Sequence, residues 1–231
     1  DGKMYAWGLN ANNQLGNIST VNRSSPQQVQ TTNSWTQVTA GTAHALGITT
    51  NGTLFGWGLN TSGQVGAIIN FAQSWTQLSV GTSQVSAIRN IGTLYAWGLN
   101  SNSQLGDNTT INKSSPVQVG AISTWTKISE GNNYSLGLRS DGSLWGWGLN
   151  NNYQLGLGNT NQRSTPTQIL TGTSFTNMSA GYDHSLAIGN DGKLYTWGNF
   201  ASLQPTNIPP TTIYSWTQIA RGGQVLALRS D

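Results

Sequence analysis

Two histidines, His44 and His184, occupy the same position in a repeated pattern of this 231-residue chain, with Gln84 and Tyr134 at two further occurrences. Imidazole could bind a metal or move a proton. A zinc site, however, needs about four protein ligands, or three and a water, and two histidines in non-adjacent repeats do not supply them. We therefore expect no metal. The four side chains should pack at the inner strand of their repeats, and together they are the candidate interaction surface at the mouth of a central channel.

The acidic residues do not indicate a hydrolase. Of seven acids, four fall at predicted hairpin turns: Asp1, Asp141, Asp191 and Asp231. Asp107, Glu130 and Asp183 are isolated in sequence, whereas glycoside hydrolysis needs two convergent carboxylates. The chain has no cysteine, no serine in a nucleophile elbow and no glycine-rich loop that leads into a helix. The sequence predicts a protein that is not an enzyme and binds no cofactor.

Five glutamines recur seven residues after a Trp-Gly tryptophan: Gln14, Gln64, Gln104, Gln154 and Gln204. A ring of five amides could bind a ligand. The alternative is that each amide bonds backbone groups of the loop between two blades, where an unpaired group would cost roughly 1 to 3 kcal/mol. We predict the structural role.

The elements that position these side chains follow a repeat that runs through the whole chain. Its Trp-Gly landmarks begin at Trp7, Trp57, Trp97, Trp147 and Trp197, at offsets of 50, 40, 50 and 50 residues. A period of this length is typical of propellers and other repeat arrays. A second landmark, Trp-Thr, lies 22 residues before the next Trp-Gly, as from Trp35 to Trp57.

Between the two landmarks the residues alternate on either side of Asn-Gly or Asp-Gly, for example at Asp141-Gly142. This pattern predicts a hairpin with a two-residue turn in which both residues have positive φ. In the long units a proline in a Ser-Ser/Thr-Pro phrase, at Pro26, Pro116 and Pro166, predicts an edge strand, where a missing N–H does no harm. No helical periodicity appears. The predicted fold is all-β, with about four short strands in each blade of a β-propeller.

The motifs Trp97-Gly98-Leu99-Asn100 with Gln104-Leu105-Gly106, and Gly181-Tyr182-Asp183-His184-Ser185-Leu186-Ala187, resemble the repeat of the regulator-of-chromosome-condensation family. The resemblance covers essentially all 231 residues as a single domain, with units that start near residues 1, 51, 91, 141 and 191. The family is usually seven-bladed. Here the five units predict a five-bladed ring or part of a longer array. We favour a ring closed by pairing residues 2–8 with the C-terminal strand near 226–230, because closure removes exposed strand edges.

Charged residues make up 7% of the chain and the net charge is +3, without a run of Lys or Arg. This composition predicts no nucleic-acid binding, and no apolar stretch is long enough for membrane insertion. We expect a non-catalytic scaffold on a cell or virus exterior that binds a protein partner, copies of itself, or a glycan. The alternatives are the exchange activity on a small GTPase that the resemblance implies, and a sugar-binding lectin propeller.

Overall fold

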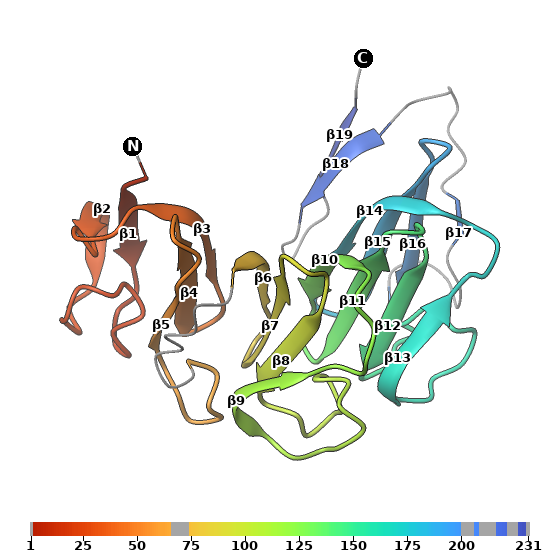
Figure 1. Cartoon of the computed structure of the whole chain (residues 1–231), viewed down its shortest axis with the longest axis horizontal. Coiled ribbons are helices and arrows are strands. Elements are labelled where there is room, and N and C mark those ends of the chain that lie inside the picture. The colour runs from red at the N-terminus through yellow and green to blue at the C-terminus, as the bar shows by residue number, and fades with distance from the viewer. Residues whose placement is uncertain (1, 66–73, 200–205, 208–215, 221–225, 230–231) are drawn as a thin grey trace.

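The computed structural model describes residues 2–65, 74–199, 206–207, 216–220 and 226–229, with side-chain surroundings up to residue 199. This part of the chain contains strands and no helix, arranged as a series of antiparallel sheets (Figure 1). The prediction of an all-β fold is confirmed.

Three sheets have four strands each and keep the chain order. They consist of β6 (Trp75–Val80), β7 (Gln84–Arg89), β8 (Leu94–Gly98) and β9 (Lys113–Gln118); of β10 (Trp125–Glu130), β11 (Tyr134–Arg139), β12 (Leu144–Gly148) and β13 (Arg163–Ile169); and of β14 (Phe175–Ala180), β15 (His184–Gly189), β16 (Leu194–Gly198) and β17 (Thr206–Asn207). A fourth sheet has the three strands β3 (Trp35–Ala40), β4 (His44–Thr49) and β5 (Leu54–Gly58). Two pairs complete the set, β1 (Met4–Gly8) with β2 (Arg23–Val29), and β18 (Trp216–Ala220) with β19 (Leu226–Arg229).

Each blade begins at the strand that carries the Trp-Thr landmark, whereas the sequence units start at the hairpin turn, near residues 1, 51, 91, 141 and 191. One blade therefore combines the end of one sequence unit with the start of the next. The first strands of successive sheets contact one another, β3 with β6, β6 with β10, β10 with β14 and β14 with β18. By position, β18 and β19 are the first half of a blade, and β1 and β2 are the second half. In the described structure β1 pairs with β2 and β19 with β18, so closure of the ring by β1 and β19 stays a prediction.

The hairpin turn differs from the predicted two-residue form. Gly142 has a φ of 80°, but Asp141 is not among the residues with positive φ. The Gly142 N–H donates to Arg139 O at 3.0 Å, and the Arg139 N–H donates to Ser143 O at 3.1 Å. These bonds define a three-residue loop that ends in one left-handed glycine, and Asp141 instead accepts the Ser143 N–H at 2.9 Å. The proline prediction is confirmed, because Pro26, Pro116 and Pro166 lie in β2, β9 and β13, each the last strand of its sheet.

Tryptophans from both landmarks form the blade cores. Trp97 and Trp147 are fully buried. Trp125 packs edge-on against Trp147 with ring centroids 5.8 Å apart, and Trp35 packs against Trp57 in the same way at 5.7 Å. Burial of such a ring stabilises the fold by up to about 4 to 6 kcal/mol. These residues are therefore structural.

Candidate interaction surfaces

His44, Gln84, Tyr134 and His184 are the first residues of β4, β7, β11 and β15. They lie on the second strand of each sheet in the order of the chain. All four are buried, with exposed fractions of 5% or less. For His44, Gln84 and Tyr134 the cause is the next blade, whose backbone covers the hairpin at this level.

Contacts at these positions join neighbouring blades. The Gln84 Nε2 donates to Gly131 O at 3.0 Å, and the Tyr134 hydroxyl donates to His184 O at 2.6 Å. Neither ring nitrogen of His44 has a hydrogen-bond partner among the described residues, and burial lowers the pKa of His44 to about 4. An interaction surface made by these four side chains stays a prediction, and in the present conformation a partner would reach only their exposed neighbours, such as Tyr182.

The recurring glutamines lie in the loops after the third strands. Four Oε1 atoms accept the N–H of the residue two positions earlier, at distances of 2.8 to 2.9 Å, in Gln14, Gln64, Gln104 and Gln154. Their Nε2 contacts differ, since that of Gln104 donates to Asn133 Oδ1 at 3.3 Å, whereas that of Gln64 has no partner among the described residues. Gln204 lies outside the described residues.

The backbone carbonyl of each described glutamine also fixes the following blade. The Trp147 indole N–H donates to Gln104 O at 3.0 Å, and the Trp197 indole donates to Gln154 O at 2.8 Å. Trp57 and Trp97 bond Gln14 O and Gln64 O in the same way. A loop of one unit is thus tied to the core tryptophan of the next.

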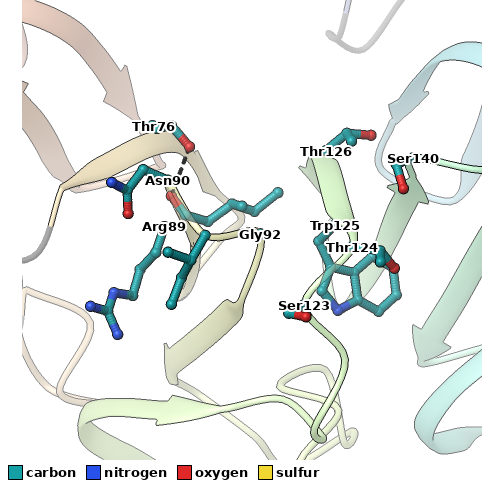
Figure 2. Close-up of a pocket in the computed structure, with 11 residues that line it drawn as sticks. Thr76, Arg89, Asn90, Gly92, Ser123, Thr124, Trp125, Thr126 and Ser140 are labelled. Carbon is teal, nitrogen blue, oxygen red and sulfur yellow. Dashed lines mark hydrogen bonds between the residues drawn. The ribbon is translucent and has the colours of Figure 1, made fainter.

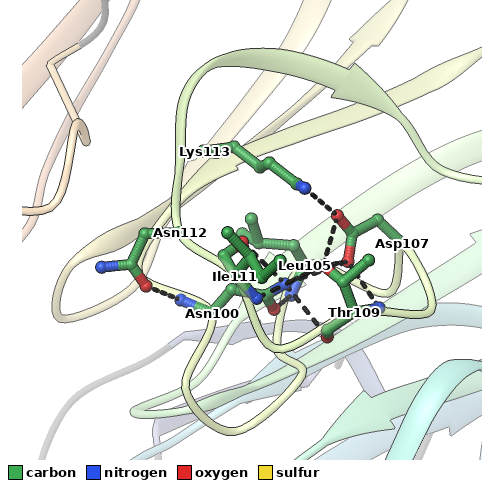
Figure 3. Close-up of polar contacts among 7 residues, drawn as sticks. All are labelled: Asn100, Leu105, Asp107, Thr109, Ile111, Asn112 and Lys113. Carbon is green, nitrogen blue, oxygen red and sulfur yellow. Dashed lines mark hydrogen bonds and ion pairs between the residues drawn. The ribbon is translucent and has the colours of Figure 1, made fainter.

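The asparagine of the Trp-Gly-Leu-Asn phrase is a structural position that was not predicted from the sequence, although its recurrence was a visible signal. Asn100 is fully buried and lies at the centre of its loop in Figure 3. Its Nδ2 donates to Asp107 Oδ1 at 2.9 Å and to Ile111 O at 3.2 Å, while its Oδ1 accepts the Leu105 N–H at 3.0 Å. Asn10 and Asn150 bond their own loops similarly. One buried amide therefore fixes each long loop.

The isolated acids stabilise local structure. Partial burial raises the pKa of Asp107, but hydrogen bonds from Thr109 and Asn100, with Lys113, outweigh it, so its pKa lies below the usual value. Glu130 is buried and accepts the Ser135 hydroxyl at 2.7 Å. Asp183 accepts the Asn199 side chain at 2.6 Å. Across residues 2–65 and 74–199 and the three short strands beyond, no group of three His, Cys, Asp or Glu could hold a metal.

The long loops, residues 9–22, 99–112 and 149–162, connect the third and fourth strands, and the first two carry exposed apolar side chains. Ile18 is 95% exposed and Ile111 is 66% exposed, while Leu9 and Val21 are also exposed. Ile18 has a φ of 56° at the position where Asn108 has 62° and Gly158 has 72°. A β-branched residue is strained in this left-handed conformation. Ile18 is therefore strained and contributes no packing to the blade core.

A groove of about 480 Å³ lies between the β7–β8 turn and the start of β10. Figure 2 shows Arg89 and Gly92 on one side of it and Thr124, Trp125 and Thr126 on the other. None of the described residues that line it is acidic. A second, apolar groove of about 230 Å³ lies where β1 faces β3, lined in part by Tyr5, Trp7 and Val38. The described residues therefore form two grooves besides the long loops.

The fold and these inter-blade contacts define a β-propeller with a repeat-protein core. The model of the regulator of chromosome condensation (RCC1) repeat matches residues 1–48, 92–138 and 141–188, and a second model of the same repeat matches residues 35–64, 125–154 and 175–204. The chain belongs to the RCC1 repeat family. No curated protein sequence matches it significantly.

Solved structures share the fold. Human WBSCR16 matches with a TM-score of 0.88 and 22% identity, over 98% of this chain and 68% of its own. Prp20p of Saccharomyces cerevisiae, which has been studied for its binding to Gsp1p and histones, matches with a TM-score of 0.85 and 22% identity, over 100% of this chain and 65% of its own. The ectodomain of the Physcomitrella patens receptor kinase CR4 matches with a TM-score of 0.65 and 20% identity, over 97% and 54%. This chain thus spans about two thirds or less of these relatives.

The described residues include no helix with the length and hydrophobicity needed to cross a membrane.

Proposed function

We propose that this chain is a non-catalytic propeller scaffold that binds a protein partner through its long third-to-fourth-strand loops, on a cell or virus exterior. The observation that carries the proposal is the pair of exposed isoleucines, Ile18 and Ile111, on loops that Asn10 and Asn100 hold in place. Fixed loops lose little conformational entropy on binding. Exposed apolar side chains on a rigid frame supply the contact area that protein interfaces use.

Two comparisons support a protein as the partner. Prp20p binds Gsp1p and histones, and a structure of yeast RCC1 (Prp20) contains Kap60. A receptor-kinase ectodomain shares the fold, and the surface carries few charges, which supports the exterior location. A small GTPase remains the second candidate partner because of the likeness to Prp20p. Self-association and glycan binding are further outcomes of the experiment below.

The test is affinity capture with two baits, the wild-type chain and a loop variant that combines Ile18→Asn with Ile111→Asn. Asn108 shows that the fold accepts asparagine at the first position, and Asn161 occupies the repeat position of Ile111. We expect a protein that binds the wild-type chain and is lost from the variant, while the variant melts at a temperature no lower than that of the wild-type chain. Equal capture by both baits, or binding to a glycan array alone, would contradict the proposal. Accelerated GDP release from a small GTPase would identify the exchange-factor alternative.

A further inference from the structure

The sheet of β3, β4 and β5 lacks the fourth strand that the next two sheets have. There β8 pairs with β9 and β12 with β13, whereas β5 is the last strand of its sheet among the described residues. The sequence gives the reason. Twelve residues, which include β9, separate Gly106 from Val119, but only two separate Gly66 from Ile69 at the same distances from the flanking tryptophans. The short unit therefore has too few residues to supply a counterpart of β9.

The strand β5 is also more exposed than its counterparts. In β8 and β12 the last three residues are buried, whereas in β5 Gly56, Trp57 and Gly58 are only partly buried. A strand that ends a sheet presents backbone N–H and C=O groups that another chain can bind. Within the described residues, β5 is thus an open edge.

The backbone groups of every second residue in β5 face this edge. The Thr49 N–H at the end of β4 donates to Thr53 O at 3.0 Å, and hydrogen-bonded pairs recur at every second residue along an antiparallel ladder. Gly56, three residues after Thr53, therefore points its N–H and C=O away from β4. Leu94 in β8 shows how such a group is used, because its carbonyl accepts the Val119 N–H at 2.9 Å from the end of the fourth strand.

The loop tip that carries Ile18 lies beside the same edge by its repeat position. In the loop 99–112, the Asn108 N–H donates to Ser164 O at 2.9 Å, and the Ser164 hydroxyl donates to the Asn108 side chain at 3.0 Å. That loop therefore contacts the start of the fourth strand, β13, in the next sheet. Ile18 occupies the position of Asn108, and the next sheet there is β3–β5. With no fourth strand to contact among the described residues, Ile18 is 95% exposed.

We propose that the open edge of β5 binds an extended segment of a partner protein, which adds to the sheet as its fourth strand and begins beside Ile18. Strand addition gains affinity from backbone hydrogen bonds and specificity from alternate side chains. This inference rests on the proposed protein-binding function and adds the conformation of the bound segment.

The side chain opposite Phe55 should be apolar. In the neighbouring sheet Tyr95 pairs with Gln118, and the Tyr95 hydroxyl donates to its side-chain oxygen at 3.4 Å. Phe55 has the position of Tyr95 but no hydroxyl. An apolar partner gains more there than an amide, because apolar cross-strand pairs stabilise a sheet.

The experiment uses the hexapeptide acetyl-Lys-Ser-Ser-Pro-Val-Leu-amide, which copies residues 113–118 with leucine in place of the final glutamine. It is titrated into ¹⁵N-labelled full chain while the Gly56 and Ile18 amide signals are followed. We expect saturable shifts of both. Gly146 is the internal control and should not shift, since it has the position of Gly56 but is already paired with Thr167 of β13.

Three peptide twins separate the contributions. A methyl group on the valine nitrogen removes the N–H that faces Gly56 and should weaken binding at least about tenfold. A methyl group on the leucine nitrogen, whose N–H points away from β5, should leave the affinity within about twofold. The twin that keeps glutamine in the last place should bind about threefold more weakly.

A protein variant supplies the missing strand from the chain itself. Residues 67–68 are replaced with the segment 107–118, the corresponding part of the next unit. We expect this strand-insertion variant to bind the hexapeptide at least about tenfold more weakly than the wild-type chain. The peptide twins test the proposal on the wild-type chain even where the variant does not fold.

Several results would overturn the inference. These are equal binding of the two methylated twins, equal binding of the leucine and glutamine peptides, a shift of Gly146 as large as that of Gly56, or full affinity in a folded strand-insertion variant. The proposed function fails separately, if the chain captures no protein or captures it equally with the loop variant. If a loop-dependent partner binds the strand-insertion variant and the wild-type chain equally, only the edge assignment is wrong.

Discussion

Replacing Gln104 with alanine removes the acceptor that a backbone N–H uses inside a buried loop. Its Oε1 accepts the Asn102 N–H at 2.8 Å, its Nε2 donates to Asn133 at 3.3 Å, and its side chain is fully buried. The bond from the Trp147 indole goes to the backbone carbonyl of residue 104, so it survives the substitution. The loss is therefore confined to the amide.

A buried donor left unpaired costs about 1 to 3 kcal/mol, and we expect Gln104→Ala to lower the free energy of unfolding by that amount. For a domain of this size each kcal/mol lowers the melting temperature by about 2 to 4 °C. Gln14→Ala should cost less, because the bond that Gln14 accepts from the Asn12 N–H at 2.9 Å is exposed and water can replace the lost acceptor. The two effects should add to within about 0.5 kcal/mol, since the sites share no partner.

Urea unfolding of the wild-type chain, both single variants and the double variant measures these free energies. Near-neutral stability in both single variants would refute the structural role of the glutamines. Lost binding at unchanged stability would restore the alternative that the amides form a ligand ring.

Further predictions concern the loops, the buried histidine and the ring. Ile18→Asn should raise the free energy of unfolding by about 1 kcal/mol, because asparagine tolerates the left-handed conformation that Asn108 adopts at φ 62°. The same substitution should weaken partner binding. A lower melting temperature of this variant would contradict the strain argument. The pKa of His44 falls on folding from 6.5 to about 4, so its protonation favours the unfolded chain. The wild-type chain should therefore lose up to about 3 kcal/mol relative to His44→Gln as the pH falls from 6.5 to about 4, and parallel pH–stability curves would be the contrary result. Deleting residues 1–8 should lower the melting temperature sharply if β1 closes the ring with β19, and a truncated chain that melts like the parent would indicate an open array.

The sequence was sufficient to predict the strands, because their periodicity and landmarks are local. The constant spacing of Trp35 and Trp57 predicts a blade core, and Pro116 predicts an edge strand because proline lacks the N–H. The type of the hairpin turn was harder to predict from the sequence. Asp141-Gly142 is compatible with both a two-residue and a three-residue loop, and the choice depends on the register of Leu138 with Leu144.

Burial of the predicted interaction residues could not be read from one repeat. Tyr134 is buried because its hydroxyl reaches His184 O and Ser185 on the next blade. The distance between two blades cannot be predicted from the local sequence of one repeat. The structural role of Asn100 in its loop could have been predicted, since the residue recurs as Asn10 and Asn150. The strain at Ile18 was not, because only the backbone shows that φ is positive there.

The most direct test of the scaffold assignment is hydrogen exchange of the chain with and without the protein that it captures. We expect slower exchange in residues 9–22 and 99–112 on binding, with the exchange of the blade strands other than β5 unchanged. Protection confined to other surfaces, or turnover of the bound molecule, would contradict the conclusion that the loops of this propeller form a non-catalytic protein-binding site.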